Sequence, residues 1–174
     1  MILWSIQGIG AWEKALKTGI LKSDKRFVPK YWVIPYQWMR LQMNDRLGTK
    51  EIGYPLWGWY QYQNSKERKP DLRSNNYMEP GSRAVRLTID IDDKKVILSD
   101  FEKWHWCLNN WYLGSDKNLQ KIEKIYKDNL TLIQAEKMRS WKKIFKIKPD
   151  KPTQATFWPI SIECVKEVTP FICR

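Results

Sequence analysis

The segment VRLTIDI, residues 85–91, alternates strictly between two kinds of side chain. Aliphatic residues stand at positions 85, 87, 89 and 91, and the three residues between them are polar or charged. A period of two is typical of a β-strand with one buried side and one solvated side. Asp92 and Asp93 favour a tight turn after it, so the apolar residues 96–98 predict a second strand that pairs with the first as a hairpin or a bulged pair.

Periodicity and chain breakers on either side of this segment predict further strands and helices. The other predicted strands are residues 2–7, 54–62, 153–162 and 167–172. The predicted helices are residues 11–18 ending at Gly19, 35–47 ending at Gly48, a helix through Trp111 with Asp100 as its N-cap, and 119–145 as one long helix or two in line. The sequence therefore predicts an α+β fold.

Size and composition are those of one folded, basic domain. The chain has 174 residues, of which 43% are apolar and 14% aromatic, and 31 Lys and Arg against 19 Asp and Glu give a formal charge of +12. We expect a single domain over residues 1–174, with a basic helical segment at about 118–148 inserted before the C-terminal strands. The uncharged start has no basic n-region and is interrupted by Gly8 and Gly10, which predicts a cytoplasmic protein without a membrane span.

Several kinds of catalytic site are excluded by residue counts. Three cysteines without a Cys-x-x-Cys pair and a single histidine do not supply a zinc site, so we expect no metal. The same count excludes catalysis that needs two histidines. No Gly-x-x-x-x-Gly-Lys-Ser/Thr segment is present to hold phosphates.

Two basic segments point to nucleic acid, most simply DNA, as the partner. Residues 121–151 hold ten basic and four acidic residues, a net charge of +6, and the loop 64–80 carries a second cluster. Such surfaces neutralise phosphates, although a merely solubilising face gives the same pattern. The residues expected to contact the nucleic-acid backbone are Lys66, Arg68, Lys69, Lys137, Arg139, Lys142, Lys143 and Lys146.

Two tryptophans and one histidine are candidates for direct contact with a nucleotide. Most of the eleven tryptophans are expected in the core, but Trp57 and Trp59 stand beside the basic loop in a strand where Gly58 would let a ligand approach the backbone. His105 lies close to Asp100 and Glu102 and would form an acid and base set with them. A buried structural histidine is the alternative.

Three segments give the whole chain a resemblance to a known family. "ILWSIQ" at 2–7, "SDFEKWH" at 99–105 and "QATFW" at 154–158 resemble the bacterial domain-of-unknown-function family 3841, whose name implies no activity.

The segments "ILWSIQGIGAWEKALKTGIL", "YPLWGWYQY", "KPDLR" and "QATFW" are also similar, more weakly, to the ADP-ribosyltransferase superfold and its DNA-targeting DarT toxins. That similarity implies a small split sheet, mixed or antiparallel, with flanking helices. Ser5 stands where those proteins have a residue that grips the nicotinamide ribose. Thr156 stands where they have a catalytic Glu, with Gln154 two residues earlier.

The resemblance implies chemistry at a nucleotide N-glycosidic bond, and three hypotheses follow. The first is a DNA glycosylase without a cofactor, with a role in phage defence by analogy. The second is an NAD-dependent DNA ADP-ribosyltransferase in which Glu102 or Asp90 replaces the missing Glu, and the third is a non-catalytic nucleic-acid-binding module. The expected catalytic residues are Asp100, Glu102 and His105. The expected substrate-binding residues are Ser5, Gln7, Trp57, Trp59, Tyr60, Arg73, Gln154 and Thr156.

Overall fold

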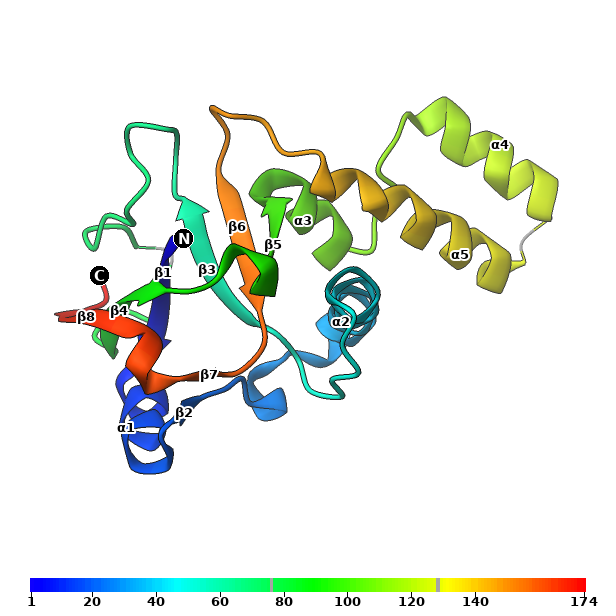
Figure 1. Cartoon of the computed structure of the whole chain (residues 1–174). Coiled ribbons are helices and arrows are strands. Elements are labelled where there is room, and N and C mark those ends of the chain that lie inside the picture. Colours follow the sequence, from blue (N-terminus) through cyan, green and yellow to red (C-terminus); the bar gives the residue numbers. More distant parts are fainter. Residues whose placement is uncertain (76, 128) are drawn as a thin grey trace.

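Six strands form one curled sheet in the computed structural model, which describes residues 1–75, 77–127 and 129–174 (Figure 1). Its strands in spatial order are β5 (Val96–Asp100), β6 (Thr153–Phe157), β3 (Leu56–Gln61), β1 (Ile2–Gly8), β4 (Arg83–Asp90) and β8 (Val165–Ile172). Within the described residues, every neighbouring pair is antiparallel. The α+β prediction is confirmed.

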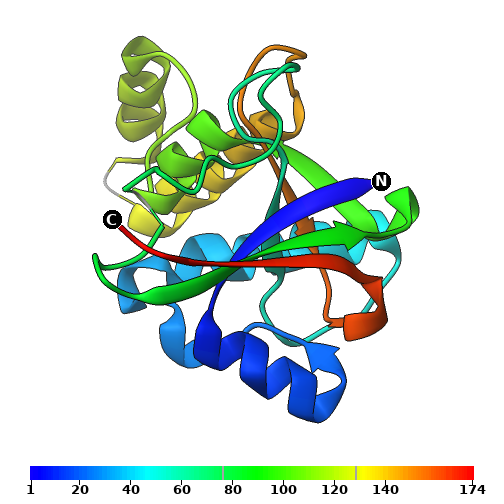
Figure 2. The same ribbon diagram turned by 90° about the vertical axis from the view of Figure 1, so that its left-hand side faces the viewer.

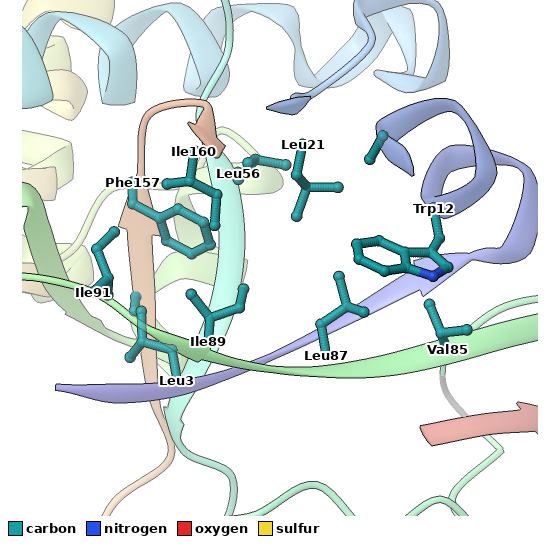
Figure 3. Close-up of a cluster of buried hydrophobic side chains, with 12 residues drawn as sticks. Leu3, Trp12, Leu21, Leu56, Val85, Leu87, Ile89, Ile91, Phe157 and Ile160 are labelled. Carbon is teal, nitrogen blue, oxygen red and sulfur yellow. The ribbon is translucent and has the colours of Figure 1, made fainter. Parts of the chain in front are cut away.

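The sheet curls around one hydrophobic core, to which β1, β3, β4 and β6 contribute buried side chains (Figure 3). Partly buried residues of both edge strands, β5 and β8, pack against this core. The alternating side chains of β4 point into this core, where Leu87 and Ile89 are fully buried. Leu98 of the edge strand β5 packs against the same cluster. Because the core lies inside the curl, the opposite, convex face of the sheet is free to carry other elements.

One end of the core is closed by α1 (Ile9–Thr18) and by the strand pair β2 (Ile20–Leu21) and β7 (Ile160–Ser161). Trp12 of α1, Leu21 and Ile160 are buried in the core. The predicted stop at Gly19 is confirmed, since this glycine has a φ of 73°, where a residue without Cβ is favoured.

A second hydrophobic cluster lies on the convex face, beneath α2 (Val33–Leu47), α3 (Phe101–Leu108), α5 (Leu130–Trp141) and the short 3-10 helix Lys142–Phe145. Ile97 of β5 points into it, whereas its neighbours in the strand point into the first core. The two clusters therefore lie on opposite faces of the same sheet.

The predicted hairpin of residues 85–91 and 96–98 is wrong. β1 and β8 occupy both edges of β4, and β5 instead pairs with β6 at the far edge of the sheet. The turn itself is present, because Asp92 caps a short 3-10 helix, Asp93–Lys95, through the backbone N–H of Lys94. This connection carries the chain from one half of the curled sheet to the other.

The prediction of one long helix or two in line over residues 119–145 is also wrong. α4 (Asp116–Tyr126) and α5 lie side by side as a helical hairpin that extends from the body of the protein (Figure 1). Lys127 has a left-handed φ of 45° and ends α4, and Asn129 caps α5 by accepting from the backbone N–H of Leu132. We call residues 116–127 and 129–141 the helical arm.

The β1, β4 and β8 part of the sheet is covered on both sides (Figure 2). α1 lies on the concave side and the loop that follows β3 lies on the convex side. Arg86 of β4 donates to the Pro70 carbonyl of this loop. In the described part of the chain, the helices are all too short or too polar to cross a membrane.

Candidate nucleic-acid interface

A row of aromatic side chains crosses the convex face from α3 to β8. Successive ring centroids lie 4.3, 4.6, 5.0, 6.2 and 6.0 Å apart. The members of this aromatic row are, in order, His105, Phe101, Trp59, Tyr62, Tyr77 and Phe171. His105 is exposed and the other five are half-buried, so each ring is anchored by the protein and still reaches solvent.

Local sequence explains how the row is built. Leu56 of β3 points into the first core, and the strand alternation sends Trp57 and Trp59 to the convex face. Asp100 caps α3, which makes Phe101 the first residue of the helix. His105 follows four residues later and therefore stands on the same helix side as Phe101.

Cationic side chains of the loop that follows β3 lie beside Tyr62 of the row. The guanidinium carbon of Arg68 is 4.4 Å from the Tyr60 ring centroid, and its Nε donates to the Tyr60 carbonyl. A cavity of about 250 Å³ opens between Tyr62 of the row and the basic loop. Its lining residues are Tyr62, Gln63, Lys66, Glu67, Arg68, Lys69 and Asp71.

Unpaired polar atoms flank the middle of the row. Gln154 of β6 stands between Trp59 and Ser99 in the sheet register. Gln154 Oε1 and Ser99 Oγ are buried and have no hydrogen-bond partner among the described residues. Buried polar groups are nearly always paired, so these atoms mark a place where a bound water or ligand is expected.

The three expected catalytic residues lie at the start of α3, but their roles differ. Asp100 is 5% exposed, and both of its oxygens bind Lys103, through the backbone N–H at 3.0 Å and through Nζ at 2.6 Å. Glu102 is exposed and its Oε1 lies 3.4 Å from Lys151 Nζ. Nδ1 of His105 lies 3.0 Å from the Phe101 carbonyl oxygen. A carbonyl oxygen only accepts, so Nδ1 is the donor of this hydrogen bond.

Trp57 and Gly58 contribute to packing. Trp57 stacks on Trp104 of α3 with ring centroids 4.8 Å apart, so the structure does not bring it into the row. A Cβ at Gly58 would lie 3.2 Å from the Trp4 carbonyl oxygen and 3.3 Å from the Phe157 ring. This glycine allows close packing of β1 and Phe157, which corrects the expectation that it opens the backbone to a ligand.

A family model for a domain of unknown function, DUF3841, matches residues 2–166. The chain belongs to this family. The matched segment includes all buried residues of both hydrophobic clusters, the helical arm and five of the six row residues. No curated protein and no solved structure matches the chain.

Two of the positions that the resemblance to ADP-ribosyltransferases singled out, Ser5 and Thr156, are internally satisfied in this DUF3841 member. Ser5 is fully buried, and its Oγ donates to the Trp57 carbonyl at 2.7 Å and accepts from Gln7 Nε2 at 2.8 Å. Thr156 is also fully buried and donates to the Ile97 carbonyl at 3.3 Å.

The basic residues fall into two separate groups. In the loop, Lys66 is exposed, Lys69 pairs with Glu167 at 3.3 Å, and Arg73 pairs with Asp71 at 2.7 Å. The hydrogen bonds from Arg73 lower the pKa of Asp71 to about 2. In the arm and its exit, Arg139 pairs with Glu136 and Lys143 donates to the Leu113 carbonyl. Among the described residues, no ion pair involves Lys137, Lys142 or Lys146.

Sequence reasoning found Trp59 and His105 but missed four members of the row. Phe101, Tyr62, Tyr77 and Phe171 come from a helix start, a loop and a distant strand, and no shared period connects them. The available signal was the presence of Tyr62 and Tyr77 at the two ends of a polar loop, where an aromatic residue without a core role is unusual.

Proposed function

We propose that the protein binds nucleic acid, most simply DNA, through unpaired nucleotides whose bases stack on the aromatic row. The observation that carries this proposal is the row itself, since five half-buried rings stand in succession and one of them, Tyr62, lines a cavity together with Lys66 and Arg68. Stacking on an aromatic ring contributes about 1–3 kcal/mol per base, and every base has a face to stack.

Anchoring and charge both favour this ligand. Rings that are already held by neighbours lose little side-chain entropy on binding, so more of the stacking energy appears as affinity. The net charge of +12 attracts a polyanion and gives binding a strong salt dependence. A nucleic acid satisfies both requirements at once.

A binding measurement with matched variants tests the proposal. Fluorescence anisotropy of a labelled single-stranded oligonucleotide is compared for the native protein, Phe101→Leu, Tyr62→Leu and Tyr31→Leu. Tyr31 is the control, because it is 74% exposed and lies outside the row. We expect each row variant to bind at least about fivefold more weakly and Tyr31→Leu to bind normally. Equal affinities for all four proteins, or no binding by the native protein, would refute the proposal.

A second candidate is cleavage of an N-glycosidic bond at the same surface. The observation in its favour is the pair of unpartnered atoms, Gln154 Oε1 and Ser99 Oγ, beside Trp59. A glycosylase holds its extruded base against aromatic walls and reads the base edge with polar groups. Because Asp100 is engaged as the cap of α3, the proposed carboxylate for water activation is Glu102, with His105 nearby.

Mass spectrometry of DNA after incubation separates the enzymatic alternatives. Free base and abasic sites that form without NAD and disappear in Glu102→Gln support a glycosylase. Transfer of label from NAD to DNA supports the ADP-ribosyltransferase alternative, which the sequence resemblance suggested. Unchanged DNA under both conditions, together with tight binding, leaves the binding module as the function.

A further inference from the structure

The helical arm presents a row of lysines on one side of α4. Lys117, Lys121 and Lys124 are exposed and are separated by four and three residues, which places them on the same helix side. Successive lysines lie about 4.5–6 Å apart along the axis at 1.5 Å per residue. No ion pair involves any of the three within the described residues. This side of α4 is suited to phosphates.

The arm is fixed to the helix that begins the aromatic row. The side chains of Asn110, just after α3, and Gln134 of α5 exchange two hydrogen bonds of 3.0 and 2.8 Å. Trp141 Nε1 donates to the Trp111 carbonyl at 2.7 Å. α3 therefore holds the row on one side and the arm on the other, and Figure 1 shows the arm extending beyond α3, away from β8.

An exposed tryptophan pair stands at the root of the arm. Trp106 of α3 is 44% exposed and Trp111 is 54% exposed, and their rings meet edge to face at 5.5 Å. Neither ring belongs to the second hydrophobic cluster. Large exposed rings at the root of an arm that carries three exposed lysines are suited to contact the end of a base stack.

We propose that the preferred ligand is a junction between single-stranded and double-stranded nucleic acid. The single strand lies on the aromatic row, the Trp106–Trp111 pair meets the terminal base pair, and the lysines of α4 bind the duplex backbone. This inference rests on the proposed function. Its physical basis is that paired bases are closed inside a duplex and do not reach the row, whereas lysines bind phosphates of either strand state.

Three ligands and two triple variants test the inference. A single strand, a blunt duplex and a duplex with a single-stranded overhang, all of equal length, are titrated by anisotropy at several salt concentrations. The arm variant is Lys117→Gln/Lys121→Gln/Lys124→Gln. The control is Lys17→Gln/Lys22→Gln/Lys30→Gln, which removes the same charge from exposed positions outside the arm.

We expect the native protein to bind the junction at least about tenfold more tightly than either simple ligand. The arm variant should lose that preference, keep its single-strand affinity, and show a junction salt slope lower by about 2–3. The control variant should bind all three ligands with the native affinities and keep the junction preference. A native protein without junction preference, or an arm variant that weakens single strand and junction equally, would overturn the inference while the proposed function stands. Absence of single-strand binding in the native protein would refute the proposed function itself.

Discussion

Asp100 and Lys103 are bound to each other twice at the start of α3. Asp100 Oδ1 accepts from the Lys103 backbone N–H at 3.0 Å, and Oδ2 lies 2.6 Å from Lys103 Nζ. The Asp100 side chain is 6% exposed and that of Lys103 is 30% exposed. This pair holds the first turn of the helix on which Phe101 and His105 stand.

Asp100→Ala should therefore destabilise the protein by about 1–3 kcal/mol, because the cap and the partner of a half-buried ammonium group are both lost. Asp100→Asn keeps the capping oxygen and should cost less. Urea unfolding measures both variants. Equal costs for Ala and Asn would show that capping is not the role of this side chain.

Two fully buried serines give a matched comparison. Ser5→Ala removes a hydrogen bond to the Trp57 carbonyl and should cost about 1–3 kcal/mol. Ser99→Ala removes a hydroxyl that bonds no protein group among the described residues, and it should cost less than Ser5→Ala. Thermal unfolding of the two variants under identical conditions gives the ranking, and the reverse order would contradict it.

Gly58→Ala should destabilise the protein by about 1–3 kcal/mol, because the added methyl group meets the Trp4 backbone and the Phe157 ring. Gly10→Ala is the control. It lies in α1 with nothing near its Cβ, so it should stabilise by about 0.5–1 kcal/mol through helix propensity. Chemical denaturation of both variants tests the difference, and a neutral Gly58→Ala would show that the strands separate easily there.

Burial raises the pKa of Tyr36 from 10.0 to about 12. The unfolded chain loses this proton first as the pH rises, so the contribution of Tyr36 to stability is complete below pH 10 and decreases between pH 10 and about 12. The loss reaches about 2–3 kcal/mol at the upper limit. Denaturant unfolding across this range should show a smaller pH dependence for Tyr36→Phe than for the native protein, and identical profiles would contradict the shift.

The loop lysines should act as phosphate contacts in single-strand binding. Lys66→Gln should lower the slope of log affinity against log salt by about 0.7, the value for one contact to a single strand. Lys25→Gln, at an exposed position away from the loop, should leave the slope unchanged. Titrations at four salt concentrations provide both slopes, and equal reductions would indicate an effect of overall charge alone.

Local features of the fold were predictable from the sequence, and strand partners were not. The alternation in β4, the stops at Gly19 and Gly48 and the cap at Asp100 depend on neighbouring residues only, and all are confirmed. The partner of β5 depends on a competition among strands distant in sequence, which β6 wins at the edge of the sheet. Proximity in the chain gave the wrong answer.

The candidate site was only partly predictable for a similar reason. Trp57 and Trp59 lie on the same strand face with Gly58 between them, and the position of α3 gives them different neighbours. α3 places Trp104 on Trp57 and leaves Trp59 to join Phe101 in the row. Whether each ring joins the row thus depends on the packing of α3, a helix that starts more than forty residues later in the chain.

The helical arm has a further consequence for how the protein melts. None of the residues of α4 is buried, so this helix shares little of the cooperative stability of the curled sheet. Amide hydrogens of α4 should exchange early, while those of β1 and β4 are protected until the whole protein opens. A nucleic acid bound to the lysines of α4 would then slow this exchange. Amide protection within this one short helix would therefore report whether the arm is occupied by ligand.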